Sequence, residues 1–572
     1  MRLERLTSIL SPKSVDEVSV ALKGRGFSRA DSGLLRIGAL APEVTMISNH
    51  VSLVFFQRTL DSGHQSVFQE CLSGRTVHPS AKLVNSFVTT FMRPGKSRCQ
   101  FFLLFICVIF VSCNLSLAQP PGKETAPPPD APKPSPPEPK SFFARWAEFY
   151  RQDWSPPPAS ASAPATARRG LPSPLDSPPF PNSDWSYGGA PVIGEPDTNS
   201  YPLMTAINRA RSRTKLYGWV EPTLNFSNSS HNNAPEANDD YSNRLEMNQF
   251  VLYAERLPDS VQRDHIDWGY HLTALYGTDY HYTTGKGYLS GQLLNDHHQY
   301  GFDPTLEYVD VYIPQVAQGM NLRLGRFISV PGIEAQLAPN NYIFSHSLLY
   351  AIDPFTDTGL MATVKLNDQW LVQLGITDGH DVALWTPDAK PTGTACLSYT
   401  TKSVNDNLYV CANGINNAKY AYNNLQQYDV TWYHRFSKTV HMATESWYMY
   451  ERDVPVLGGK IQPETGANAA YCLTGEQRCT APEYAIVNFL QKELSAHNFL
   501  SFRSDFLDDK KGQRTGYATR YSENTITWCH WIGTTVQLRP ELRFEHAWDQ
   551  KAYDNGRRHN QLTVASDLIF HF

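Results

Sequence analysis

From about residue 213 to the C-terminus, apolar and polar side chains alternate along one short segment after another. Successive side chains of a β-strand point to opposite faces, so this period of two predicts strands with one apolar and one polar face. The clearest case lies near the end of the chain, where Leu538, Leu542 and Phe544 alternate with four charged residues. Those charged residues are Arg539, Glu541, Arg543 and Glu545. The alternation predicts an all-β fold for residues 213–572.

Two architectures satisfy this pattern, a soluble sandwich and a closed antiparallel transmembrane β-barrel. Tyr and Trp lie near the ends of the predicted strands, as they do at the two interfaces of a membrane. The connections are also of two kinds. Tight turns are predicted at 367–368 and 437–438, and long polar connections at 385–424 and 454–481. Short turns on one side and long loops on the other are typical of outer-membrane barrels, so this asymmetry favours the barrel.

The chain ends on an alternating strand, with Phe570 and Phe572 on its apolar face. A terminal aromatic residue in this setting resembles the signal that the outer-membrane barrel assembly machinery reads. About 360 residues, at about 10 per strand plus connections, accommodate about 14 to 18 strands. A closed barrel with both chain ends on one side needs an even number, and we expect about 16.

Residues 92–118 have the three parts of a secretory signal peptide, namely a basic start, an apolar run at 101–111 and a cleavage site at 116–118. The apolar run of about 11 residues is short of the roughly 20 that a transmembrane helix needs. A signal peptide works at the N-terminus of a chain. We therefore expect translation to start at Met92, with residues 1–91 a misassigned upstream extension.

Residues 119–212 carry most of the prolines and are expected to form an extended or disordered periplasmic segment. One island near 141–154 places Phe142, Trp146 and Phe149 at helical spacing. Two interpretations are open for this short helix. It rests as an amphipathic helix on the barrel or the membrane surface, or it is a coiled-coil stub that joins copies of the chain.

The charge balance bears on the class of partner. The net charge is -5 at pH 7, so the chain has no basic field with which to neutralise the phosphates of a nucleic acid. Aromatic residues make up 12% of the chain and charged residues only 18%, which suits sheets with one apolar and one polar face. A nucleic-acid partner is excluded on these grounds.

Five cysteines follow the predicted signal peptide: Cys396, Cys411, Cys472, Cys479 and Cys529. Two local disulfides, Cys396–Cys411 and Cys472–Cys479, would suit an oxidising compartment, and free thiols are the alternative. Cys529 has no obvious partner. The spacing matches no zinc pattern, so we expect neither a metal nor a cofactor.

Three segments, at 216–222 (LYGWVEP), 322–327 (LRLGRF) and 338–347 (APNNYIFSHS), resemble the OmpL-like β-barrel porins. The resemblance covers about residues 194 to 572. It implies an outer-membrane barrel that conducts solutes passively, and it brings no catalytic residues with it.

In a pore the working side chains face the lumen, where charges set ion preference and a constriction sets size. The predicted pore-lining residues are Arg323, Arg503, Asp505, Arg539, Glu541, Arg543 and Glu545. The alternative is that opposite charges on neighbouring strands neutralise one another and stiffen the wall. Charges of both signs also argue against extreme ion selectivity.

The stretch 331–358 is long and interrupts the strand rhythm. We expect it to fold inward and to form the constriction of the pore. The polar residues predicted to act there are Glu334, Asn340, Asn341, His346, Asp353 and Asp357.

Three functions are compatible with the sequence. The favoured one is a bacterial outer-membrane porin that passes small hydrophilic solutes or ions, with outer-membrane lipid around it and association into homo-oligomers left open. The second is a secreted soluble β-protein that binds carbohydrate through aromatic side chains, and the third is a barrel hydrolase with catalytic residues at strand ends. No HExxH, GxSxG or CxxC motif occurs, so we predict no catalytic residue and no enzyme.

Overall fold

The structure is a computed structural model, in which a defined set of residues is described. These are residues 140–155, 193, 201–236, 238–417, 420, 422, 424–463, 465–495 and 497–572. The predicted upstream extension, the signal peptide and most of the Pro-rich segment lie outside the described residues.

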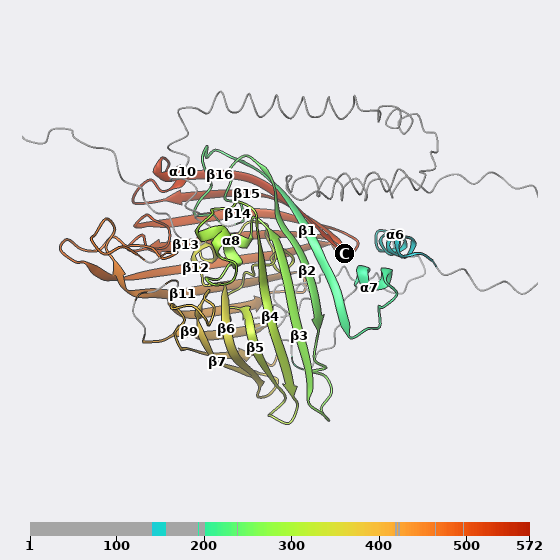
Figure 1. Ribbon diagram of the computed structural model, residues 1–572. Helices are drawn as coiled ribbons and strands as arrows, with labels where there is room; N and C mark the ends of the chain where they lie inside the picture. The colour runs from blue at the N-terminus through green and yellow to red at the C-terminus, as the bar shows by residue number, and fades with distance from the viewer. Residues whose placement is uncertain are drawn as a thin grey trace, which may run out of the picture. The chain divides into compact units, whose positions relative to one another are not determined.

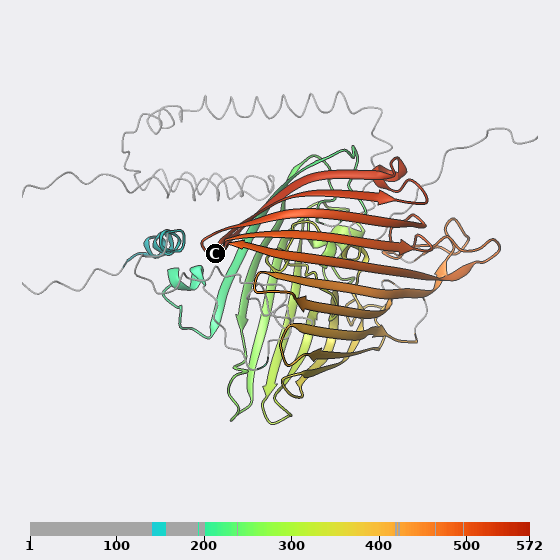
Figure 2. The ribbon, with the colours of Figure 1, turned by 180° about the vertical axis from the view of Figure 1, so that it is seen from behind.

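Sixteen antiparallel strands form one closed barrel, in which each strand pairs with its neighbours in sequence and β1 pairs with β16 (Figures 1 and 2). The predicted fold class and strand number are confirmed. The strands are β1 (Thr214–Ser227), β2 (Leu245–Arg256), β3 (Asp267–Gly277), β4 (Gly301–Ile313), β5 (Met320–Ile328), β6 (Thr356–Lys365), β7 (Trp370–His380), β8 (Thr392–Thr400), β9 (Asp406–Ile415), β10 (Gln426–Arg435), β11 (Val440–Pro455), β12 (Arg478–Ser495), β13 (Asn498–Asp509), β14 (Thr519–Ile532), β15 (Val536–Ala547) and β16 (Asn560–His571).

The two ends of the barrel differ in their connections. One end, called here the turn end, carries short turns such as 366–369 and 436–439 together with the start of β1 and the end of β16. The other, the loop end, carries long connections such as 278–300, 329–355 and 456–477. The predicted tight turns are therefore confirmed.

The predicted long connection at 385–424 is wrong, because it contains the strands β8 and β9. Their outward-facing residues include Leu397 and Val410, but the inner face carries Cys396, Tyr409 and Cys411 as well as small polar residues. Apolar and aromatic residues on both faces give little hydropathy contrast, so the alternation was not visible in the sequence.

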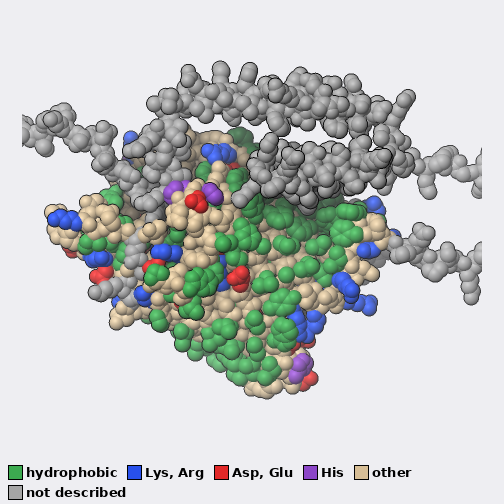
Figure 3. Space-filling view, in the orientation of Figure 1, with side chains coloured by type: hydrophobic (Ala, Val, Ile, Leu, Met, Phe, Trp, Pro, Cys, Tyr) green, Lys and Arg blue, Asp and Glu red, His purple; other side chains and the backbone are tan. Residues whose placement is uncertain are grey.

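The barrel has apolar side chains on its outer surface and charged side chains in its interior, which is the reverse of a soluble protein. In β15, Leu542 and Phe544 are each 46% exposed, whereas Arg539 and Arg543 are 0% exposed. Figure 3 shows apolar side chains over the outer face of the strands, with charged side chains mainly toward the ends. A soluble sandwich would bury its apolar faces, so that alternative is contradicted.

The closure of the barrel depends on a close approach at Gly218. The Gly218 N–H donates to the Phe572 carbonyl at 3.1 Å, and the Phe572 N–H donates to the Gly218 carbonyl at 2.9 Å. A Cβ on Gly218 would lie 2.0 Å from the Val251 carbonyl oxygen and 2.8 Å from the Phe572 ring. The terminal aromatic ring thus occupies space that only glycine leaves free.

Helices are few among the described residues, and all of them are short. The helix α6 (Phe142–Asp153) confirms the predicted helix near 141–154. The others are α7 (Pro202–Ala206), α8 (Tyr280–Thr283), α9 (Gly291–Leu294), α10 (Tyr553–Gly556) and the 3-10 turns η1 (Ala338–Asn340) and η2 (Tyr350–Ile352). Within the described part of the chain, no helix has the length and apolar character needed to cross a membrane.

Candidate functional site: the charged interior and its loop

The connection 329–355 between β5 and β6 folds into the interior of the barrel, and nearly all of its residues are buried. Polar residues of β9 and β10 hold its two ends. At the start, the Asn413 amide donates to the Ser329 hydroxyl at 2.9 Å. At the end, the Gln427 amide donates to the Asp353 carboxylate at 2.5 Å.

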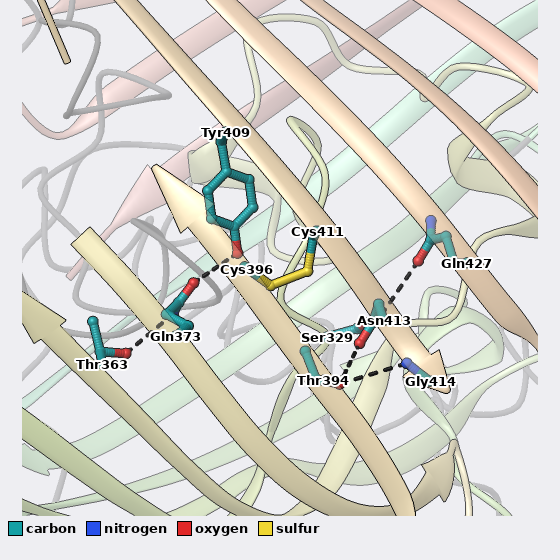
Figure 4. Close-up of a disulfide and its surroundings, with 10 residues drawn as sticks. All are labelled: Ser329, Thr363, Gln373, Thr394, Cys396, Tyr409, Cys411, Asn413, Gly414 and Gln427. Atoms are coloured by element: carbon teal, nitrogen blue, oxygen red, sulfur yellow. Dashed lines mark hydrogen bonds between the residues drawn. A yellow bond between two sulfur atoms is a disulfide. The ribbon is translucent and has the colours of Figure 1, made fainter. Parts of the chain in front are cut away.

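Figure 4 shows the polar network on the inner wall around the start of this loop. Cys396 and Cys411 are opposite each other in the register of β8 and β9 and form a disulfide. The Tyr409 hydroxyl donates to Gln373 at 2.6 Å. Gln373 in turn donates to Thr363 at 3.1 Å, so β6, β7 and β9 are linked through their inner faces. A second disulfide joins Cys472 to Cys479, and Cys529 is a buried free thiol.

All of the predicted pore-lining residues face the interior and are buried. Each arginine among them is paired with an acid. The pairs are Arg323–Asp310 at 2.8 Å, Arg503–Glu523 at 3.1 Å, Arg539–Asp567 and Arg543–Glu545 at 2.8 Å. This is the geometry expected if opposite charges neutralise one another along the wall, the alternative left open by the sequence.

Three of these arginines, all on β13 and β15, also bind the loop. The Arg503 guanidinium donates to the carbonyl and the hydroxyl of Ser345. Arg539 donates to the Asn341 carbonyl at 2.8 Å, and Arg543 donates to the His346 carbonyl at 2.5 Å. Charge-assisted hydrogen bonds of this kind are stronger than neutral ones.

Acidic side chains of the wall accept hydrogen bonds from the N–H groups of the loop. Asp505 accepts from the Leu348 N–H at 2.8 Å, and Glu541 accepts from the Ser345 N–H at 3.1 Å. Glu445 of β11 accepts from the Ile333 N–H at 2.7 Å. A loop inside a barrel needs partners for its backbone groups, and the charged wall provides them.

The loop is also packed by apolar contacts with the same wall. Leu348, Leu349 and Phe355 belong to one buried cluster with Trp447 of β11 and Leu507 of β13. The loop is therefore held by apolar burial and by charged hydrogen bonds at once, on the side of the barrel formed by β11 to β15.

The predicted constriction residues do not all lie where the sequence suggested. Glu334 accepts hydrogen bonds from Ser347, and the Asn341 side chain bonds the backbone of Ala335 within the loop. Asn340 and Asn341 are buried and Glu334 is half-buried, and His346 stacks on Tyr350 with 3.9 Å between ring centroids. Asp357, in contrast, belongs to β6, where its carboxylate lies 2.6 Å from His380 of β7.

Several interior charges were missed in the sequence, among them Glu221, Glu236, Glu445, Glu523 and Asp567. A usable signal existed for Asp567, because Leu562, Val564, Leu568 and Phe570 mark the apolar phase of β16 and Asp567 falls on the other. Glu236 lies in the connection between β1 and β2, where no periodicity points to it.

A closed barrel of 16 strands, with an apolar outer face, a charged inner face and a loop folded into its interior, is a porin-like β-barrel. The chain belongs to the family described as "Putative beta-barrel porin-2, OmpL-like", whose model matches residues 213–572. This confirms the resemblance seen in the sequence.

Solved structures that the chain matches include outer-membrane porins and channels. An anion-selective porin from Comamonas acidovorans is 11% identical, with a TM-score of 0.41, and the match covers 63% of this chain and 99% of that one. The outer-membrane channel DcaP of Acinetobacter baumannii is 13% identical, with a TM-score of 0.41, over 63% and 97% of the two chains. No match is found among curated protein sequences.

Proposed function

We propose that this chain is an outer-membrane porin through which small hydrophilic solutes or ions diffuse passively. One observation carries the proposal, namely the inversion of faces over a closed set of 16 strands. Lipid tails can cover an apolar outer face, and a closed barrel leaves no unpaired strand edge in the hydrocarbon. The polar inner face then lines the path of the solute.

In this proposal the loop 329–355 narrows the pore. Its tip, residues 345–347, is bound to Arg503, Arg543 and Glu541 on the opposite wall, so it crosses the interior. The predicted arginines of the wall are each paired with an acid, but buried acids outnumber buried arginines among the described residues. Charges of both signs argue against extreme ion selectivity, and the excess of acids favours cations over anions.

The proposal places the turn end in the periplasm and the loop end outside the cell, because both chain ends of such barrels lie in the periplasm. Export would use the signal peptide at 92–118, with translation starting at Met92. The assembly machinery would read the last strand with Phe570 and Phe572, and outer-membrane lipid would surround the barrel. Association into homo-oligomers is compatible with this arrangement.

Measuring the conductance of the purified chain in lipid bilayers tests the porin proposal. Chain purified from outer membranes should migrate differently on a gel before and after boiling, as closed barrels do, and should form channels in planar bilayers. Deleting residues 334–353 should raise the single-channel conductance, whereas shortening the loop 456–477 should leave it unchanged. A folded barrel that admits neither ions nor small sugars into liposomes would contradict the proposal.

The porin proposal assigns no catalytic residue. Ser347, His346 and Glu334 do lie together in the loop, but the Ser347 hydroxyl donates to Glu334 and not to a histidine. A hydrolytic triad needs the serine hydroxyl hydrogen-bonded to the base. Ser347→Ala should accordingly leave conductance intact, and an esterase activity lost in this variant would favour the hydrolase instead.

A further inference from the structure

The helix α6 carries an aromatic face outside the barrel. Phe142, Phe143, Trp146, Phe149 and Tyr150 fall within this single short helix, and Trp154 follows at its C-cap. At 100° per residue these side chains gather on one side, and Ala144, Glu148 and Gln152 lie on the other. Helices with such a face need an apolar surface to cover it.

The C-terminal end of α6 is fastened to the turn between β14 and β15. The Asp153 carboxylate accepts hydrogen bonds from the Thr534 N–H at 2.9 Å, the Thr534 hydroxyl at 2.7 Å and the Thr535 hydroxyl at 2.8 Å. Gly533 has φ +57°, and a Cβ there would lie 2.2 Å from Asp153. Because Gly533 has no side chain, the turn leaves room for the Asp153 carboxylate.

A second contact joins α6 to the end of the last strand. The Tyr150 hydroxyl donates to the His571 carbonyl at 2.9 Å, and the Tyr150 ring lies 5.1 Å from that of Phe570. Phe570 is on the apolar outer face of β16. The helix therefore docks on the outside of the barrel wall at the turn end, next to the C-terminus and α7 (Figures 1 and 2).

Part of the aromatic face remains open after docking, since Tyr150 is buried and Phe142, Trp146 and Phe149 are half-buried. Phe143 is 60% exposed and Trp154 is 46% exposed. The barrel has its own ring of exposed tryptophans at the turn end: Trp268, Trp370, Trp432 and Trp528. Such rings mark the level of a membrane interface, where amphipathic aromatic side chains are favoured. The Tyr150 ring, on the same helix, contacts Phe570 of the apolar outer surface of β16.

We infer that α6 is an interfacial helix, which lies in the inner leaflet of the outer membrane with the open part of its aromatic face, Phe143 and Trp154, toward the lipid. Asp153 and Tyr150 anchor it to the barrel rim. The inference rests on the proposed function, because it takes the outer face of the barrel to be covered by lipid. Of the two interpretations of this helix, the inference favours the membrane surface over a coiled-coil stub. A coiled coil would use the same aromatic side chains that the inference places in the bilayer.

The depth of α6 can be measured with nitroxide labels in proteoliposomes of phosphatidylethanolamine and phosphatidylglycerol. Labels are placed at Phe143→Cys and, as the matched control on the other side, at Ala144→Cys. Cys529 and any upstream cysteine that the isolated chain retains are replaced by serine. We expect oxygen to reach the label at 143 more readily than a water-soluble nickel chelate, and the order to reverse at 144.

Other outcomes would overturn the inference. Equal access of the nickel chelate to both labels would place α6 in water, and a label at 143 that neither reagent reaches would place it in a protein contact. Asp153→Ala should raise the mobility of the label at 143; unchanged mobility would refute the anchor. Solute flux into the same liposomes tests the porin function separately. A failure of the proposed function can therefore be distinguished from a failure of the inference about α6.

Discussion

The charged wall has two tasks, because its side chains pair with one another and also bind the loop. Replacing Arg503 with methionine tests both. The guanidinium pairs with Glu523 at 3.1 Å, and it donates to the carbonyl and hydroxyl of Ser345 in the loop. Removing one partner of a buried ion pair costs about 3 to 5 kcal/mol, because the other charge stays buried. The hydrogen bonds to the loop contribute about 2 kcal/mol more, which would change the ratio of bound to released loop about 30-fold.

The double variant Arg503→Met with Glu523→Gln distinguishes these costs. It removes the orphaned charge, so most of the lost free energy of unfolding should return, as measured by urea unfolding in detergent micelles. The loop remains without its Arg503 contacts. Single-channel recordings should therefore show larger or noisier openings in both variants. Wild-type conductance and noise in the double variant would refute the claim that the wall holds the loop.

Four further substitutions test other parts of the structure. Gly218→Ala should lower the free energy of unfolding by about 1 to 3 kcal/mol, because a Cβ there meets the Val251 carbonyl and the Phe572 ring, and an unchanged urea midpoint would contradict the closure geometry. Asn524→Leu, on the outer face of β14, should raise stability in lipid by about 1 kcal/mol, whereas the same change at the inward Asn413 should lower it. Burial raises the pKa of Asp554, but hydrogen bonds from His231 and Ser230 outweigh it and hold that pKa below its ordinary value. This contact joins the connection between β15 and β16 to the connection between β1 and β2. It stabilises both connections above about pH 4 and is lost as the pH falls through the lowered pKa of Asp554. Acid and Asp554→Asn should therefore each reduce the protection of the amides at 228–232 against hydrogen exchange.

The sequence alone determined the faces of most strands. In β15 each residue from Leu538 to Glu545 lies on the side that the alternation predicted, apart from Pro540, which the pattern left unassigned. Strand number and closure also followed, because chain length and the need for an even count restrict the choice. The helix α6 was predicted from aromatic spacing. The alternation failed at β8 and β9, where Cys396, Tyr409 and Cys411 on the inner face conceal the period.

Only the tertiary structure decided what the interior charges contact. Arg503 and Ser345 are 158 residues apart in sequence, and Arg539 and Ala338 are 201 apart. Local periodicity fixes the face on which a side chain lies, but it carries no information about which strands stand opposite one another across a closed barrel. The partners of the loop depend on that closure and on the path of residues 329–355 through the interior. The sequence therefore predicted an inward loop and a charged wall, and the fold paired them.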